Sequence, residues 1–315
     1  MNEAIEQLFD EYMKERRYSR KLSDVSLNGY RYAFNLFMKI MPGTELIDLS
    51  DKTMIEFFAR LEKRKRTVGR GEIKEGIKKS TVATYRSKLN SFFNWLKIKG
   101  KIKENPFTFM EYPDVQYADM RYLKKEEVER IIIAMEMKIN WKNLFVKKRN
   151  IAIIQVLLCC GLRRGELLGL KISDIDFGRR ELTVRSETSK SRAKRTVPVN
   201  SSVMALLEDY RNELKRKNYI SPYFFVSENG DKKLTDHGFK HLIDDLNKRT
   251  GVKFHAHQFR HTFAVNVLLN NGNEIAKLKQ LMGHRDIRMT AAYLRCLPTR
   301  ALRQDVEVIN LENLY

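Results

Sequence analysis

Residues 104–122 interrupt a chain that otherwise spaces its apolar residues regularly. This segment, ENPFTFMEYPDVQYADMRY, contains Pro106 and Pro113 and follows neither the helical nor the strand period. Such a break is typical of a linker between domains, and 315 residues are enough for two hydrophobic cores. We therefore predict a domain over residues 1–103, a linker over 104–122, a second domain over 123–299 and a C-terminal tail over 300–315.

Before the linker, apolar residues recur at the three- and four-residue spacing of amphipathic helices. After a first helix within residues 1–17, Ser26 is expected to cap the second helix, Ser50 or Asp51 the third and Ser80 the fourth. Between the third and fourth helices, the run LEKRKRTVGRGEIKEGIKKS contains three glycines and is predicted to be a loop. The first domain is therefore expected to be a compact bundle of about four helices.

After the linker, long helical patterns alternate with short strand-like ones. Helices are expected at residues 124–137, 147–161, 200–217, 235–250, 258–270, 273–282 and 286–294. The segments ELTVRS at 181–186 and KRTVPV at 194–199 flank a polar turn, which predicts an antiparallel hairpin. The expected fold class is therefore mainly α (α+β), with a small antiparallel sheet in the second domain.

The chain carries a formal net charge of +21, which indicates a polyanionic partner. Residues 51–100 hold 14 basic and 5 acidic residues, and residues 151–200 hold 10 and 5. Two separate cationic regions favour a protein that holds double-stranded DNA from two sides, since contacts to phosphates supply most of the non-specific affinity. In the first domain the expected DNA contacts are Lys63, Arg64, Lys65, Arg66, Arg86 and Lys88. The alternative for these residues is a solvated surface without a partner.

Composition argues against several other classes of protein. No apolar run reaches the roughly 18 residues that span a bilayer, and the mixed-charge segment MNEAIEQLFDEYMKERR is not a signal peptide. Cys159, Cys160 and Cys296 lack zinc spacing and are expected to be reduced. No acidic cluster suggests Mg²⁺. We predict a cytoplasmic, nucleoid-associated protein with no metal, no other cofactor and no membrane partner.

The stretch from His255 to Tyr293 contains four of the six histidines of the chain. Arg260 stands among them, and Tyr293 ends the stretch. A cluster of histidine and arginine can bind a phosphodiester, and a tyrosine hydroxyl can attack it. Each of these residues alone has an ordinary structural explanation, so the prediction depends on the whole pattern.

Four segments, in this order and spacing, resemble the tyrosine recombinases of the integrase and Xer-like type. They are GLRRGELLGL, SETSKSRAKRTVPV, HAHQFRH and LMGHRDIRMTAAY, and they lie between residues 124 and 295. The resemblance implies that the catalytic residues are Arg163, Lys190, His257, Arg260, His284 and the nucleophile Tyr293. It also implies supporting roles for Glu166 and His261 and a DNA contact for Arg192. Lys194 and Arg192 share the turn with Lys190 and are the alternatives for its role.

The same resemblance implies a SAM-like core-binding domain followed by a catalytic domain of the tyrosine recombinase type. Arg163 and Arg260 would bind the non-bridging oxygens of the scissile phosphate, with His284 as a further donor. His257 would accept the proton of the Tyr293 hydroxyl, and Lys190 would protonate the leaving 5′ oxygen. The product would be a 3′-phosphotyrosyl link, which conserves the bond energy so that no ATP is required.

At the level of the assembly, the resemblance implies a homo-tetramer on two DNA sites that recombines them through a Holliday junction. The biological outcome would be integration or excision of a mobile element, or dimer resolution. Accessory DNA-bending or directionality factors are further expected partners. Residues 300–315 would dock on a neighbouring subunit, or alternatively pack on their own domain. Two other functions stay open: DNA relaxation like that of a type IB topoisomerase, and non-catalytic regulation by DNA binding.

Overall fold

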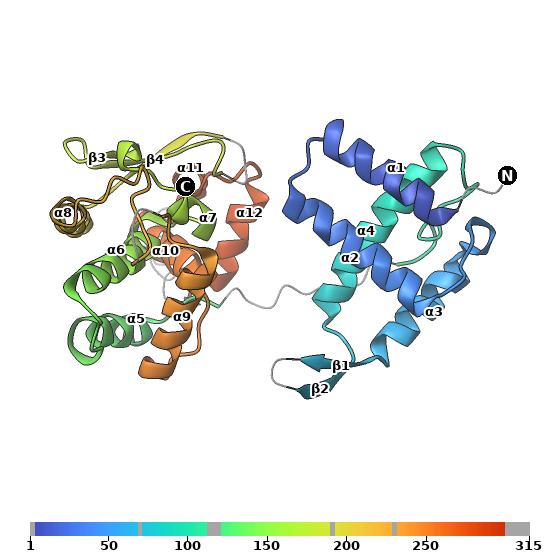
Figure 1. Cartoon of the computed structure of the whole chain (residues 1–315), viewed down its shortest axis with the longest axis horizontal. Helices are drawn as coiled ribbons and strands as arrows, with labels where there is room; N and C mark the ends of the chain where they lie inside the picture. The colour runs from blue at the N-terminus through green and yellow to red at the C-terminus, as the bar shows by residue number, and fades with distance from the viewer. Residues whose placement is uncertain (1–3, 69–70, 112–120, 190–192, 229–231, 300–315) are drawn as a thin grey trace, which may run out of the picture. The chain divides into compact units, whose positions relative to one another are not determined.

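The computed structural model describes residues 4–68, 71–111, 121–189, 193–228 and 232–299. The chain folds into two compact units, Met1–Tyr117 and Ala118–Tyr315 (Figure 1). Helices build most of each unit, and each contains a small antiparallel sheet. The predicted fold class is therefore confirmed.

In the N-terminal unit, four helices pack around an aromatic core. The described elements are α1 (Ile5–Tyr18), α2 (Asp24–Ile40), the 3-10 turn η1 (Leu46–Asp48), α3 (Asp51–Glu62), β1 (Lys65–Val68), β2 (Glu72–Glu75) and α4 (Lys79–Ile98). Phe9 stacks on Phe34 with ring centroids 3.9 Å apart, and Phe92 meets Phe9 edge-on at 5.1 Å. These rings come from α1, α2 and α4, so their burial joins the helices into one bundle.

Two of the predicted helix caps in this unit are wrong. The side chain of Ser23, not Ser26, caps α2, and the Ser23 Oγ accepts the N–H of Ser26 at 3.4 Å. Helix α4 begins at Lys79, so Ser80 lies inside it. The prediction for α3 holds, because Ser50 Oγ accepts the N–H of Thr53. Each error moves a boundary by a few residues, which is the part of a helix that sequence patterns define least well.

The charged run between α3 and α4 is a hairpin, which corrects the predicted loop. Strands β1 and β2 pair antiparallel, with Arg66 opposite Lys74 and Thr67 opposite Ile73. The hairpin extends beyond the helices of its unit (Figure 1). The β-branched residues favour the strand conformation, and Gly71, at φ 100°, supplies the turn.

Arg86 is not an exposed DNA contact, which corrects another prediction. Arg86 is 5% exposed, and its guanidinium donates to the backbone carbonyls of Met110 and Glu111. The same group lies over the ring of Phe107. The chain after α4 thus folds back over a helix face that is polar in sequence. Arg86 instead anchors the first part of the segment predicted as linker.

The C-terminal unit contains the remaining helices and the second sheet. Its described helices are α5 (Lys125–Ile133), the π turn η2 (Ala134–Lys138), α6 (Leu144–Cys160), α7 (Arg164–Leu168), the 3-10 turn η3 (Ile172–Asp174), α8 (Ser201–Arg216), α9 (Asp236–Thr250), α10 (Ala256–Asn270), α11 (Ile275–Met282), α12 (Arg288–Ala291) and the 3-10 turn η4 (Ala292–Cys296). Its strands are β3 (Ile175–Asp176), β4 (Glu181–Val184) and β5 (Arg195–Pro198), in the order β3-β4-β5. The predicted hairpin is confirmed, with Leu182 opposite Val197.

Helix α6 is the centre of this unit, where it packs against α8 and α10. Helix α6 carries apolar residues on every face, as expected for a helix that neighbouring elements cover on all sides. Gly161 ends it at φ 60°, and a Cβ there would lie 2.2 Å from the ring of Phe263. Only glycine fits this turn, and the turn leads directly into the segment that carries Arg163.

No helix within the described residues is long and apolar enough to cross a membrane. In the same part of the chain, no group of three or more His, Cys, Asp or Glu side chains is placed to hold a metal ion. Cys159, Cys160 and Cys296 are free thiols.

Candidate active site

Arg163 and Glu166 stand at the start of α7. The backbone N–H of Arg163 donates to Glu166 Oε2 at 2.9 Å, and its Nη1 donates to Oε1 of the same carboxylate at 2.9 Å. The carboxylate thus satisfies an N–H that no helical carbonyl can reach, and it fixes the arginine side chain. Because that side chain keeps 18% of its surface exposed, it is held in place and still reachable by a ligand.

Arg260 lies on α10 and is almost completely buried, at 1% exposure. Its Nη1 donates to the carbonyl of Gly161 at the end of α6. Its Nη2 donates at 2.7 Å to the carbonyl of Met282 at the end of α11. Two helix C-termini therefore hold the buried cation through their negative ends. Burial and the charge of Arg163 lower the pKa of Arg260 to about 9, so it stays charged at neutral pH.

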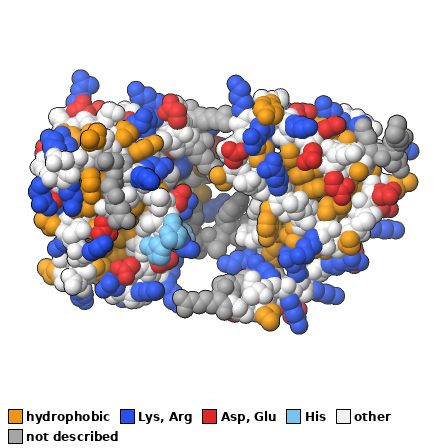
Figure 2. All heavy atoms as spheres, in the orientation of Figure 1, with side chains coloured by type: hydrophobic (Ala, Val, Ile, Leu, Met, Phe, Trp, Pro, Cys, Tyr) orange, Lys and Arg blue, Asp and Glu red, His pale blue; other side chains and the backbone are white. Residues whose placement is uncertain are grey.

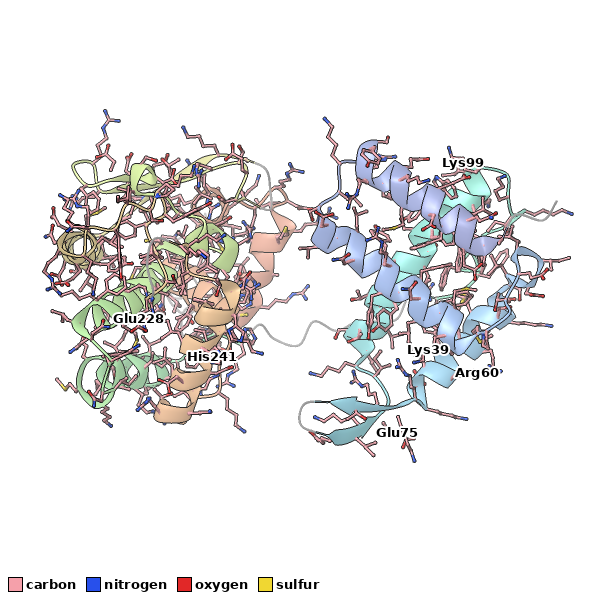
Figure 3. All side chains as sticks on the ribbon, viewed as in Figure 1. Lys39, Arg60, Glu75, Lys99, Glu228 and His241 are labelled. Atoms are coloured by element: carbon pink, nitrogen blue, oxygen red, sulfur yellow. The ribbon has the colours of Figure 1, made fainter. Side chains whose placement is uncertain are left out.

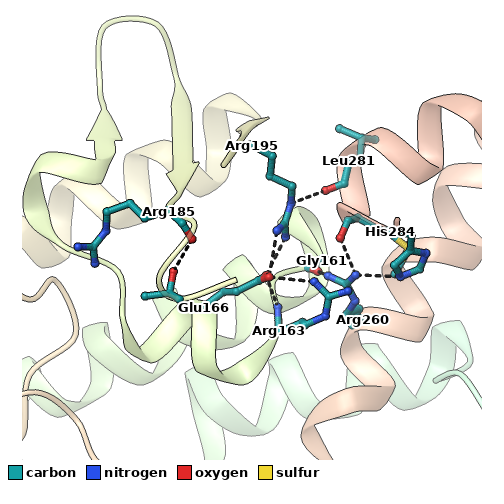
Figure 4. A network of polar contacts seen from close by, with 10 residues as sticks. Gly161, Arg163, Glu166, Arg185, Arg195, Arg260, Leu281 and His284 are labelled. Carbon is teal, nitrogen blue, oxygen red and sulfur yellow. Dashed lines mark hydrogen bonds and ion pairs between the residues drawn. The ribbon is translucent and has the colours of Figure 1, made fainter. Parts of the chain in front are cut away.

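His284 follows α11 and contacts Arg260 directly (Figure 4). Its Nε2 lies 3.1 Å from Arg260 Nη2, and its Nδ1 lies 2.9 Å from Thr290 Oγ1. Because arginine only donates, Nε2 must be the acceptor, and Nδ1 carries the hydrogen that Thr290 accepts. Burial and the charge of Arg260 lower the pKa of His284 to about 4, in agreement with a neutral ring. In this structure His284 therefore holds Arg260 in place.

Tyr293 lies on η4 and is 3% exposed. Its hydroxyl is 2.9 Å from Nδ1 of His261, and its ring lies parallel to that of His284 with centroids 6.4 Å apart. Burial raises the pKa of Tyr293 to about 12, although the charges of Arg260 and Arg163 act in the opposite direction. The phenol is therefore protonated at rest, and both arginines are close enough to stabilise the phenolate that a reaction would form.

His257 lies one helical turn before His261 and is exposed, and the two rings meet edge-on with centroids 4.5 Å apart. The sequence predicts a supporting role for His261. In the structure its ring contacts the Tyr293 hydroxyl directly. The four-residue spacing on one helix face was the signal for this pair. Lys190 and Arg192 lie outside the described residues, and Lys194 is exposed.

Arg195 is a member of the cluster that the sequence did not reveal. It opens β5, its side chain is 8% exposed, and it forms an ion pair with Glu166 at 2.7 Å. Burial raises the pKa of Glu166, but the hydrogen bonds and charge of Arg195 outweigh this and hold the pKa below its usual range. The buried Glu166 carboxylate is therefore shared by the guanidiniums of Arg163 and Arg195. The guanidinium of Arg260 is the third cation of the cluster. The positive charge that remains suits an anionic phosphodiester.

The depressed pKa values of His261 and His284 predict a loss of stability in mild acid. Both lie at about 4, below the usual 6.5, so the unfolded chain binds more protons between these pH values. Stability should be complete above pH 6.5 and should fall toward pH 4. By pH 5 the cost is on the order of 2 kcal/mol for each imidazole. Urea unfolding at pH 7.5 and 5.0 measures it, above the range where carboxylates protonate.

The matched variants for this measurement are His284→Gln and His237→Gln. The first should lose about half of the pH dependence, because one buried imidazole is gone. The second should keep all of it, since His237 is exposed on α9. Equal stability of the wild-type protein at the two pH values would contradict the assignment of neutral, buried rings.

Comparisons with known proteins show the family to which this chain belongs. The phage integrase family model matches residues 121–300. A tyrosine recombinase of Thermosipho africanus is 30% identical over 297 residues, covering 93% of this chain and 95% of the relative. A tyrosine recombinase XerC of Bacillus pumilus is 29% identical over 300 residues, with 91% and 90% covered.

Among solved structures, the Tn1549 transposon integrase in complex with a circular intermediate DNA superimposes with a TM-score of 0.75 at 21% identity. The superposition covers 98% of this chain and 99% of that one, so the fold is the same. The family model covers more than half of the chain and includes every residue from Arg163 to Tyr293 discussed above. This chain therefore belongs to the phage integrase family and is a tyrosine recombinase.

Proposed function

We propose that this tyrosine recombinase cuts and rejoins DNA at specific sites through a covalent link between Tyr293 and a 3′ phosphate. The observation that carries the proposal is the surroundings of the Tyr293 hydroxyl. It is hydrogen-bonded to His261 and lies in the field of the Arg260 and Arg163 guanidiniums. A phenol beside two fixed cations is suited to attack an anionic phosphodiester, because the cations stabilise the charge that develops on phosphorus.

In the proposed reaction, the Tyr293 oxygen forms a bond to phosphorus as the bond from phosphorus to the 5′ oxygen breaks. Arg163 and Arg260 bind the non-bridging oxygens. His257 accepts the phenolic proton, with His261 in contact with the same hydroxyl. Lys190 donates a proton to the leaving 5′ oxygen, with Lys194 and Arg192 as the alternatives. Attack of a 5′ hydroxyl on the phosphotyrosine reverses the step and rejoins the DNA.

His284 takes part through its contact with Arg260. At rest its Nε2 accepts from Arg260, so it is not a donor there. An anionic phosphate beside the ring favours the protonated imidazole, and its Nε2–H then donates to the phosphate in place of accepting from Arg260. The predicted role as a donor to the phosphate therefore requires DNA in the site.

For DNA binding, we propose that residues 1–103 hold one side of the duplex and residues 123–299 the other. Lys63, Lys65 and Arg66 are exposed at the base and along the first strand of the hairpin, and Arg64 is half-buried. Figure 2 shows basic side chains over this end of the unit. Arg66 lies directly opposite Lys74 of the second strand, and Lys74 forms an exposed ion pair with Glu72 at 3.4 Å. Lys88 lies over the ring of Tyr30 and is a further candidate contact.

The hairpin contacts predict a specific change in the salt dependence of binding. Replacing Lys65 and Arg66 by Gln should make the negative slope of log K against log salt concentration less steep by about 2. The control replaces Lys39 and Lys52, which are exposed on α2 and α3 of the same unit, and should keep the wild-type slope. Figure 3 labels Lys39 and the hairpin residue Glu75. Fluorescence anisotropy at several salt concentrations measures both; equal slopes would remove the hairpin from the interface.

For the assembly, we propose a homo-tetramer on two DNA sites that proceeds through a Holliday junction. Residues 300–315 lie outside the described residues, and we propose that they dock on a neighbouring subunit. A groove of about 550 Å³ between α5 and α10, lined among others by Leu269 and Pro298, is a candidate acceptor on the catalytic unit. Accessory DNA-bending or directionality factors, and a location with the nucleoid in the cytoplasm, remain predictions.

A duplex with a nick beside the cleavage site tests the proposal, because loss of a short fragment traps the covalent intermediate. A covalent protein–DNA product is expected and would exclude a non-catalytic regulator. Exchange of strands between two labelled sites is also expected, and relaxation of supercoiled DNA without exchange would instead indicate a topoisomerase. Selection of binding sites from genomic DNA near the gene would supply the substrate and separate element integration from dimer resolution.

A further inference from the structure

Arg195 connects three segments of the catalytic unit that are distant in sequence. On one side, its Nη1 and Nη2 donate to Glu166 Oε1 and Oε2 at 3.0 and 2.7 Å. This is a two-point contact that only a planar guanidinium forms. Glu166 also accepts twice from Arg163, so its two oxygens each receive one bond from each arginine. The carboxylate is saturated, and its orientation is fixed from both sides.

On the other side, Arg195 holds the end of α11. Its Nε donates to the carbonyl of Leu281 at 3.0 Å, and the next carbonyl, that of Met282, accepts from Arg260. Two consecutive carbonyls at one helix end are therefore held by two arginines. Gly283, at φ 62°, follows, and a Cβ there would lie 2.8 Å from Cδ of Arg195. The arginine side chain thus packs against the turn that directs His284 toward Arg260 (Figure 4).

Arg195 also belongs to β5, which begins five residues after Lys190 in the sequence. One buried side chain therefore joins β5, the Arg163 segment and the segment before His284. Without it, Glu166 would keep Arg163 as its sole arginine partner among these contacts, and the end of α11 would lose a donor. Catalytic groups that are displaced by about 1 Å lose on the order of 100-fold in rate.

Given the proposed function on which it rests, we propose that Arg195 is a positioning residue for the cleavage step. It shares the Glu166 carboxylate with Arg163 and fixes the turn before His284, so that the groups contacting the scissile phosphate are already in place when DNA binds. It touches none of the reacting atoms itself. Its contribution is therefore to the rate of cleavage in the bound complex and not to the affinity for DNA.

The test replaces Arg195 by Lys, which keeps the charge but cannot form the two-point contact. At saturating protein, the first-order rate of covalent product formation on the nicked duplex should fall about 100-fold. The dissociation constant for DNA should stay within about 2-fold of wild type, as expected for an interaction that acts in the bound complex. Glu166→Gln should show a similar loss, and the double variant should lose less than the product of the two single losses, because part of each loss is the one contact that the two residues share.

Arg185→Lys is the matched control. Arg185 directly follows β4 of the same sheet and is partly buried. It binds the carboxylate of Asp174 and the backbone carbonyl of Gly169. The Arg185→Lys variant should cleave DNA within about 2-fold of the wild-type rate, because the substitution removes the same kind of contact away from Glu166 and the end of α11. Arg195→Gln is measured beside Arg195→Lys, and the melting temperature of every variant is recorded.

Three outcomes would overturn the role of Arg195. They are a wild-type cleavage rate in a folded variant, a rate loss that only follows weaker DNA binding, and failure of both Arg195 variants to fold, which would make the residue purely structural. Absence of covalent product with the wild-type protein would instead refute the proposed function, so the two failures are distinct.

Discussion

Tyr293→Phe should bind DNA like the wild-type protein and form no covalent product, a loss of more than about 10³-fold in cleavage. Binding should survive because the ring is 3% exposed and the removed oxygen faces His261 inside the protein. The lost hydrogen bond should cost about 1 kcal/mol of unfolding free energy. Gel electrophoresis under denaturing conditions measures the adduct, and anisotropy measures the affinity.

Tyr219→Phe is the control for the removal of a tyrosine hydroxyl. Tyr219 donates to the carbonyl of Glu228 at 3.1 Å, in the same unit but outside the cluster around Arg260. This variant should keep the wild-type rate of cleavage. Covalent product from Tyr293→Phe would mean that another residue is the nucleophile.

Arg260→Lys should show the second large effect, with both slower cleavage and lower stability. A lysine ammonium cannot reach the carbonyls of Gly161 and Met282 together, so at least one buried acceptor loses its donor, at a cost of about 2 kcal/mol. Loss of the guanidinium that we propose to bind the phosphate should slow cleavage about 10³-fold at saturating protein. Denaturant unfolding and single-turnover cleavage measure the two effects separately.

Arg149→Lys separates these two contributions. Arg149 is 8% exposed and donates to the carbonyl of Val226, so it is another buried arginine of the same unit. Its replacement should lower stability to a similar extent and leave the rate of the bound complex within about 2-fold. If Arg149→Lys cleaved as slowly as Arg260→Lys, the effect would be one of stability alone.

Periodic patterns in the sequence predicted most of the architecture. The apolar faces of α1 to α4, the buried helix α6 and the β4–β5 hairpin are local features with strong signals. The site motifs predicted which segments carry chemistry, and the structure brings Arg163, Glu166, Arg260, His284 and Tyr293 into one connected cluster.

The missed features depend on contacts between distant residues. The polar helix face around Arg86 predicts an exposed side chain, but the chain that covers it lies 24 residues later. The sequence around Arg195 predicts an ordinary strand residue, because its partner Glu166 lies 29 residues earlier. The sequence did not predict the β1–β2 hairpin, because its strands are short, charged and exposed. Such strands lack the apolar alternation that identifies a half-buried strand.

The most direct test of the cluster is to identify the residue and the DNA end that are joined in the trapped complex. The adduct formed on a nicked duplex is digested with a protease and a nuclease, and the remaining peptide is sequenced by mass spectrometry. Tyr293 should carry the phosphate, joined to the 3′ end of the broken strand, with a free 5′ hydroxyl on the released fragment. A link at a different side chain, or to a 5′ phosphate, would contradict the arrangement of Arg163, Arg260 and Tyr293 around one scissile phosphate.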